Sequence, residues 1–216
     1  MKNKVYIEFV GITNSGKTRL MNALKLQCEM NGFSVKTPYD YSLFEKLSFV
    51  VRIPRTIAIW TKKTYQTTRS VRGTLEFMRK IIPALAMARS KHRNSEEVLI
   101  LDEGILHKFR RLRKISRSKI ILSEMATENE LALFFPEIPN IVVVIHVEPE
   151  IFQKRQQKDD VLFDIESAER QIGKMRNSIS DLQVLEGQET VVIHVNNNSE
   201  EDLEKAVKQI SEKIDL

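Results

Sequence analysis

The chain of 216 residues is long enough to bury one sizeable hydrophobic core, and it falls in the size range of a single α/β domain. With 42% hydrophobic and 29% charged residues, 7 glycines and 6 prolines, the composition excludes a disordered or low-complexity protein. The single cysteine, Cys28, excludes an intramolecular disulfide and a cysteine-rich metal cluster, and we expect a buried, inert thiol there.

Basic and acidic residues are divided unevenly along the chain. Residues 1–119 hold 25 Lys and Arg against 9 Asp and Glu, whereas residues 120–216 hold 9 against 20. Between Arg52 and Arg93 the only acid is Glu76. Such a segment favours an anionic partner, although each cation alone is typical of a solvated helix face. No run of 18 apolar residues and no cleavage-site pattern occurs, so we expect a cytoplasmic protein with no membrane partner.

The first elements predicted along the chain are a strand, a loop and a helix. Residues 4–10, "KVYIEFV", are rich in β-branched and aromatic residues and predict a buried strand. A helix is predicted over residues 17–31, where Asn-Gly ends it. A short second strand from Phe33 closes at Pro38 and brings Asp40 to its carboxyl end.

The remaining chain alternates between helical and strand patterns. Residues 42–93 have helical spacing with breaks near Pro54 and at 70–73, and Trp60 is expected to pack in the core. Residues 105–135 are helical or irregular. Further strands are predicted at 98–101, from 140 and at 190–195, and further helices from 150, from about 165 and after a Ser199 cap.

Apolar strands that alternate with helices predict a three-layer, doubly wound α/β fold. We expect a mainly parallel sheet of about five strands with helices on both faces, in one domain over residues 1–216. Ligands of such sheets bind beyond the carboxyl ends of the strands. The residues that follow strands, Gly11–Thr18, Asp40 and Asp102, are predicted to lie there.

The segment "GITNSGKT" fits the phosphate-loop pattern G-x-x-x-x-G-K-[ST] at every fixed position. Gly11 and Gly16 allow the backbone to turn, and the helix that begins at Lys17 adds its positive dipole end. Lys17 is expected to reach the β and γ phosphates, and the Thr18 hydroxyl to bind Mg²⁺. The predicted nucleotide-binding residues are Gly11, Thr13, Asn14, Ser15, Gly16, Lys17 and Thr18.

An acidic residue near the metal is expected in such a site, and "VLILDEG" supplies one. Asp102 stands where the apolar run ends, so it is predicted to bind Mg²⁺ or to accept a proton from an attacking hydroxyl. Glu103 points the opposite way if the segment is extended, and it is an alternative on the acceptor side, as is Asp40. The four histidines are scattered and predict no metal site.

The phosphate loop, "LILDEG", "IVVVIHVEPEIFQKRQQK" and the closing "TVVIHVNNNSEEDLEKAVKQI" together resemble the P-loop nucleoside and nucleotide kinases, most closely the thymidylate-kinase-like branch. The resemblance implies a lid over about residues 150–165, with Arg155 and Lys158 as its cations, and an acceptor side formed by the basic segment 42–93. Relatives carry arginine where this chain has Glu103, which leaves the acceptor open.

Together these patterns predict a kinase that uses ATP and Mg²⁺ to phosphorylate a small, anionic or nucleoside-type acceptor. Lys17, Asp102 and Arg155 are its expected catalytic residues. The alternative is an ATPase or nucleotide switch that binds nucleic acid through the basic amino-terminal part and "HKFRRLRKISRSK" at 107–119. A GTP switch is less favoured because the chain has no Asn-Lys-x-Asp element. The oligomeric state stays open, with a homodimer among the alternatives.

Overall fold

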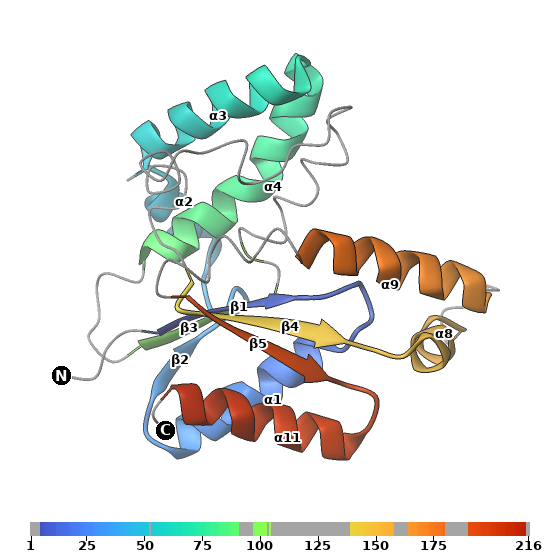
Figure 1. Cartoon of the computed structure of the whole chain (residues 1–216). Helices are drawn as coiled ribbons and strands as arrows, with labels where there is room; N and C mark the ends of the chain where they lie inside the picture. Colours follow the sequence, from blue (N-terminus) through green and yellow to red (C-terminus); the bar gives the residue numbers. More distant parts are fainter. Residues whose placement is uncertain are drawn as a thin grey trace.

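A computed structural model of the protein describes residues 5–51, 53–90, 97–102, 104, 139–157, 164–179 and 190–214. Five strands form one sheet in the order β2-β3-β1-β4-β5, and all of the strand pairs are parallel. The strands are β1 (Val5–Val10), β2 (Ser34–Lys36), β3 (Glu97–Leu101), β4 (Ile141–His146) and β5 (Val191–Asn196). The parallel sheet with helices on both faces confirms the predicted α/β class (Figure 1).

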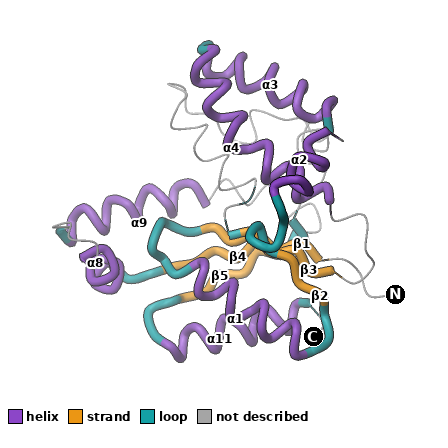
Figure 2. Tube along the Cα trace, turned by 180° about the vertical axis from the view of Figure 1, so that it is seen from behind, coloured by secondary structure: helices purple, strands orange, loops and turns teal. Residues whose placement is uncertain are grey.

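Helices α1 (Lys17–Met30) and α11 (Glu200–Lys213) lie side by side on one face of the sheet, as Figures 1 and 2 both show. Their apolar sides pack on alternate residues of the strands, among them Ile7 and Phe9, because successive side chains of a strand point to opposite faces. The other face is covered by α4 (Val71–Ser90), α8 (Pro149–Gln157) and α9 (Ile165–Ile179). The two apolar layers bury the sheet between them.

The part of the chain between β2 and β3 forms a helical layer, which lies above the sheet in the view of Figure 1. It consists of α2 (Leu43–Val51), α3 (Pro54–Thr68) and α4, with breaks where they were predicted. Trp60 of α3 is fully buried, and its ring stacks on Phe77 with centroids 6.2 Å apart, which confirms its packing role. The core of this layer is continuous with the upper layer of the sheet.

Several local expectations are confirmed by the structure. The Ser199 hydroxyl accepts a hydrogen bond from the backbone N–H of Asp202 at 3.1 Å and so caps α11. Cys28 is buried, and burial raises the pKa of its thiol to about 11, so it stays protonated and unreactive.

No helix among the described residues is long and apolar enough to span a bilayer. Glu103, Lys158 and residues 105–135 lie outside the described residues.

Candidate phosphate-binding site

The loop from Gly11 to Gly16, called the glycine loop below, connects β1 to α1. Two of its residues have left-handed backbone conformations, Asn14 with φ 63° and Gly16 with φ 87°. The backbone N–H of Ser15 donates to the carbonyl oxygen of Ile12 at 3.2 Å and closes the turn. Left-handed residues in such a loop turn backbone N–H groups toward a common centre, which creates an anion-binding concavity at the start of a helix.

Lys17 occupies the first position of α1 and is buried. Its ammonium Nζ donates hydrogen bonds to the carbonyl oxygens of Gly11, at 3.1 Å, and Ile12, at 2.7 Å. The cation is therefore held over the glycine loop by the loop's own backbone. Because the positive end of the α1 dipole lies at the same place, this end of the helix favours a bound anion.

Both fixed glycines of the loop are required by close contacts. A Cβ atom on Gly11 would lie 2.7 Å from Oγ of Ser15, and one on Gly16 would lie 2.1 Å from Nδ2 of Asn197. Gly16 also has a backbone conformation that side chains with Cβ disfavour. The two glycines thus allow two close contacts, that of Gly11 with Ser15 and that of Gly16 with Asn197, which follows β5.

Asn197 connects the glycine loop to the opposite end of the chain. It is 1% exposed, and its Nδ2 donates to the carbonyl oxygen of Ser15 at 2.8 Å. Its own backbone N–H donates to the carbonyl oxygen of His146 at 3.0 Å, which ties it to the end of β4. Oδ1 of Asn197 and Oγ of Ser15 are both buried and have no hydrogen-bond partner among the described residues. Two polar atoms at the loop are therefore left with unused hydrogen-bonding capacity.

Arg155 of α8 reaches the same place. Its guanidinium donates to the carbonyl oxygens of Ser15, at 3.3 Å, and Asn197, at 2.7 Å. Burial and the neighbouring charge of Arg19 lower the pKa of Arg155, because both disfavour a second cation there. Arg19 in turn pairs with Glu200 of α11. A bound anion would relieve the repulsion between the two arginines.

Asp102 follows β3 directly, and β3 pairs with β1. The carboxyl ends of these neighbouring parallel strands lie at one edge of the sheet, so Asp102 and the glycine loop share that edge. Its Oδ2 accepts a hydrogen bond from the Tyr39 hydroxyl at 3.1 Å. Tyr39 comes from the turn after β2 and is 69% exposed. The Asp102 carboxylate is therefore fixed by one hydrogen bond and remains partly exposed.

The donor chemistry of Asp102 and Thr18 fits magnesium. Thr18 is exposed at the start of α1, and a hydroxyl with a carboxylate gives the hard oxygen ligands that Mg²⁺ prefers. Among the described residues no group of three or more His, Cys, Asp or Glu side chains could hold a metal alone.

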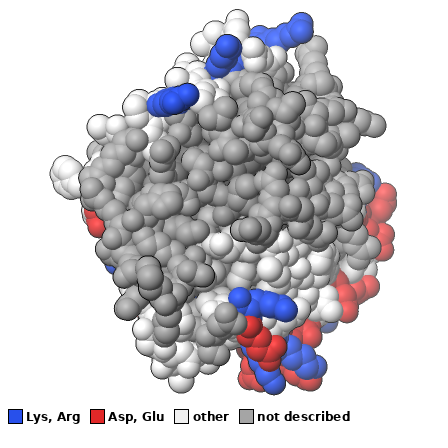
Figure 3. Space-filling model, turned by 60° about the vertical axis from the view of Figure 1, so that its left-hand side comes forward, with Lys and Arg blue, Asp and Glu red and all other residues white. Residues whose placement is uncertain are grey.

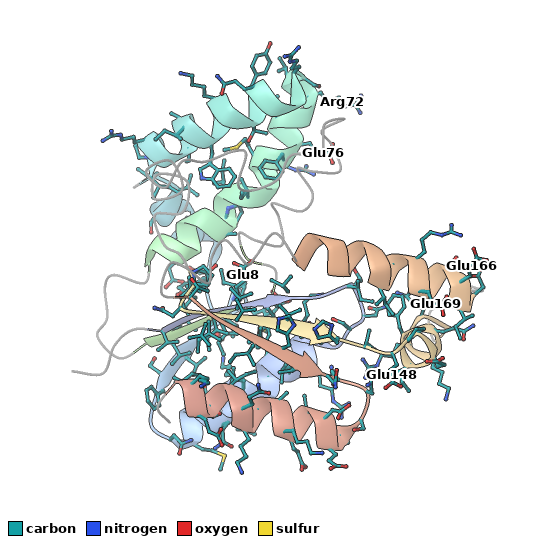
Figure 4. The ribbon with its side chains drawn as sticks, viewed as in Figure 1. Glu8, Arg72, Glu76, Glu148, Glu166 and Glu169 are labelled. Atoms are coloured by element: carbon teal, nitrogen blue, oxygen red, sulfur yellow. The ribbon has the colours of Figure 1, made fainter. Side chains whose placement is uncertain are left out.

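A buried carboxylate, Glu8, lies beneath the segment that follows Asp102. Glu8 is fully buried in β1 and points from the sheet toward the helical layer (Figure 4). Its Oε2 accepts a hydrogen bond from the Tyr6 hydroxyl at 2.8 Å. A Cβ on Gly104 would lie 2.4 Å from this carboxyl group. Gly104 is thus the residue type that lets the chain after Asp102 pass over Glu8.

Asp40, an alternative on the acceptor side, is engaged within its own turn. Its Oδ2 accepts from the backbone N–H and the hydroxyl of Thr37, both at 2.8 Å, and Lys25 Nζ donates to both carboxylate oxygens at 2.9 Å. Burial raises the pKa of Asp40, but these hydrogen bonds outweigh it and lower the pKa below its usual value. Its carboxylate is thus committed to closing the turn.

The structure brings most of the predicted residues together. Lys17, Arg155 and the glycine loop meet, with Thr13 and Asn14 exposed on the loop crest and Asp102 along the same sheet edge. Sequence reasoning missed Asn197 and Tyr39, which carry no motif, and Glu8, although an acid inside an apolar strand was a visible signal. It also missed that two of the scattered histidines, His146 and His194, meet through their ring nitrogens at 2.9 Å.

The sequence matches no protein-family model, and no curated protein shows significant similarity to it. Its function is therefore inferred from the geometry of the site.

Proposed function

We propose that the protein is an ATP- and Mg²⁺-dependent phosphotransferase that acts on a small anionic or nucleoside-type acceptor. The observation that carries the proposal is the convergence of Lys17 from α1, Arg155 from α8 and Asn197 from the turn after β5 on one glycine loop. Phosphoryl transfer requires positioning and charge neutralisation more than covalent chemistry, and this convergence supplies both.

In the proposed reaction the acceptor oxygen forms a bond to the γ phosphorus while the bond from that phosphorus to the β–γ bridging oxygen breaks. The loop amides and Lys17 hold the β and γ phosphates, and Arg155 neutralises charge on the transferred group. Thr18 and Asp102 would hold Mg²⁺, which neutralises part of the phosphate charge when it is bound. Asp102 also stands where it can accept the proton of the acceptor hydroxyl.

The acceptor is assigned to the side of Asp102 on which Tyr39 lies. Tyr39 presents its exposed ring beside Asp102, and the helical layer contributes the basic segment between β2 and β3. An aromatic ring and several cations suit a flat or phosphorylated acceptor. These groups favour a flat or phosphorylated acceptor, and a screen for the phosphorylated product would identify it.

The proposal is tested by nucleotide binding and product formation. ATP with Mg²⁺ should raise the melting temperature of the wild-type protein, since a ligand that binds the folded state at 100 times its Kd adds about 2.7 kcal/mol to stability. Lys17→Ala should abolish this shift, and Lys208→Ala on the exposed side of α11 is the matched control. A mass-spectrometric screen of metabolite pools with ATP then identifies the phosphorylated product. ATP turnover that survives Lys17→Ala would refute the proposal, and an equal response to GTP would refute the assignment of ATP.

The alternative of a nucleic-acid-binding ATPase was predicted from the basic amino-terminal part and from the basic run at 107–119, and this run lies outside the described residues. It stays a prediction.

A further inference from the structure

Cationic and apolar side chains share the outer surface of α3 and the start of α4, in the part of the helical layer farthest from the sheet (Figure 1). This hairpin surface is defined by the exposed residues Arg55, Lys62, Tyr65, Arg69, Val71 and Leu75. None of them belongs to the glycine loop or to the Asp102 edge. The surface lies on the part of the helical layer that is farthest from the sheet, so it is distinct from the side of this basic segment that is assigned to the acceptor (Figure 1).

Cations recur at a regular spacing along α3 and at its end. Arg55 and Lys62 are seven residues apart, which is two helical turns or about 10 Å, so they lie on one side of α3, and Arg69 follows the helix directly. The opposite side of α3 carries the buried residues Trp60 and Thr64. No acidic residue occurs anywhere in α3. On the face shown in Figure 3, the charged side chains seen at the top of the molecule are Lys and Arg, whereas lower down Lys and Arg are mixed with Asp and Glu.

Large apolar side chains gather where the two helices meet. Arg69 and Ser70 connect α3 to α4 in a tight turn, with Arg69 at φ 46°. Around this turn Tyr65 is 51% exposed, and Val71 and Leu75, one helical turn apart, are each 64% exposed. Scattered single apolar residues are ordinary on a surface, but three around one turn with cations beside them are typical of an interaction site.

The carboxyl-terminal part of the chain has the opposite net charge. Residues 120–216 hold 20 acidic against 9 basic residues. Near a negatively charged surface the molecule is attracted through its hairpin and repelled at α11, which holds five acidic against three basic residues. The asymmetry therefore selects an orientation in which the hairpin faces the anionic partner.

We propose that the hairpin surface docks on membranes that contain anionic phospholipids. Arg55, Lys62 and Arg69 contact the phosphate headgroups, and Tyr65, Val71 and Leu75 enter the interface between headgroups and acyl chains. The aliphatic side chains decide between a lipid and a nucleic acid, because Val71 and Leu75 match nothing on a phosphodiester backbone and Tyr65 is a single aromatic. The sequence predicted no membrane partner because it contains no spanning segment. Such a segment is needed to cross a bilayer, but a protein can bind the bilayer surface without one.

The test is co-sedimentation of the full chain with vesicles of phosphatidylcholine alone and of phosphatidylcholine mixed with phosphatidylglycerol. The wild-type protein should bind the mixed vesicles, more weakly as salt is raised, and should not bind phosphatidylcholine alone. The triple variant Arg55→Gln, Lys62→Gln, Arg69→Gln should lose about 100-fold in affinity, as expected for three removed cations. Val71→Ser with Leu75→Ser should lose about tenfold at unchanged charge.

Two control variants test whether vesicle binding depends on the hairpin surface and not on charge or apolar area elsewhere. Lys205→Gln, Lys208→Gln, Lys213→Gln on α11 removes as much charge from the other end, and Leu26→Ser removes an exposed apolar side chain from α1. Both should bind like the wild type, and equal melting temperatures should show that all variants fold. The proposal is overturned if the wild type ignores mixed vesicles at low salt, or if the α11 control loses as much affinity as the hairpin variant. It is also overturned if the hairpin cations bind a labelled oligonucleotide while the vesicles remain unbound.

Discussion

The glycine loop after β1 and the turn after β2 occupy similar places in the sheet, but their charged side chains are hydrogen-bonded in different ways. Both follow a strand of the same parallel sheet and both hold a charged side chain, Lys17 in one and Asp40 in the other. In the turn, every hydrogen bond of Asp40 comes from Lys25 or Thr37, and both oxygens are used. At the loop, Arg155 donates to two neutral carbonyl oxygens, and Ser15 Oγ has no hydrogen-bond partner in the part of the chain that the structure describes.

The difference separates a structural charge from a ligand-binding one. A carboxylate that accepts charge-assisted hydrogen bonds on both oxygens contributes to stability and has little left to offer a ligand. A guanidinium against neutral carbonyls exchanges them readily for phosphate oxygens, which are the stronger acceptors. Disruption of the loop should therefore reduce binding and transfer, whereas disruption of the turn should reduce stability alone.

Gly16→Ala should have the largest effect. The new Cβ would meet Nδ2 of Asn197 and would sit on a backbone with φ 87°, so we expect a loss of about 3 kcal/mol in unfolding free energy together with loss of ATP binding. Urea denaturation measures the stability. Gly173→Ala in α9 is the control, since nothing lies within 4 Å of its added Cβ and alanine favours helix. The double variant with Asn197→Ala should recover part of the loss, and no recovery would show that the contact with Asn197 is unimportant.

Arg155→Met should leave the fold intact and slow phosphoryl transfer. Methionine preserves the packing of the side chain's apolar part and removes the charge, so we expect kcat to fall about 100-fold with a smaller change in KM for ATP. Steady-state kinetics on the product from the metabolite screen measure the split. Arg170→Met, which removes an exposed arginine paired with Glu166, should change neither constant. If KM alone rises, Arg155 binds the nucleotide without assisting transfer.

Asn197→Ala should have an intermediate effect on both properties. It removes the hydrogen bond to the Ser15 carbonyl oxygen and should cost about 1–2 kcal/mol of stability and about tenfold in ATP affinity. Isothermal titration with ATP and Mg²⁺ measures the affinity, and Asn196→Ala at the exposed end of β5 is the neighbouring control. A stability loss with unchanged affinity would limit Asn197 to a structural role.

The parts of the fold and of the site that could be predicted from the sequence are those that depend on local patterns. The strands are short apolar runs, the helix starts have recognisable caps such as Ser199, and the glycine loop is a contiguous motif. Each of these depends on neighbours in the chain, so periodicity and spacing predict them well. The parallel sheet and its covering on both faces followed from the alternation of apolar strands with helices, whereas the order of the strands was not predicted.

The rest of the site depends on contacts between distant segments. Asn197 and Ser15 are 182 residues apart, and Tyr39 and Asp102 are 63 apart, so neither pair leaves a mark in any local window. Asp40 shows the opposite difficulty: an acid after a strand fits an acceptor site and a turn equally well from sequence alone. Its hydrogen bonds to Lys25 and Thr37 decide between them. Glu8 could have been singled out, because a buried acid in a central strand needs a partner.

Asp40→Asn should have the smallest effect and a characteristic pH dependence. An amide keeps the shape and weakens the bonds from Lys25 and Thr37, so we expect a loss of about 1 kcal/mol at neutral pH. Because the pKa of Asp40 is lowered in the folded protein, its contribution is present above the pKa of an unfolded aspartate and is lost as the pH falls through the folded value. Urea denaturation of both proteins across acidic pH should therefore show the difference at pH 7 shrinking on acidification, with ATP binding at pH 7 unchanged. A fall in ATP turnover without a fall in stability would return Asp40 to the acceptor side and end the distinction between the turn and the loop.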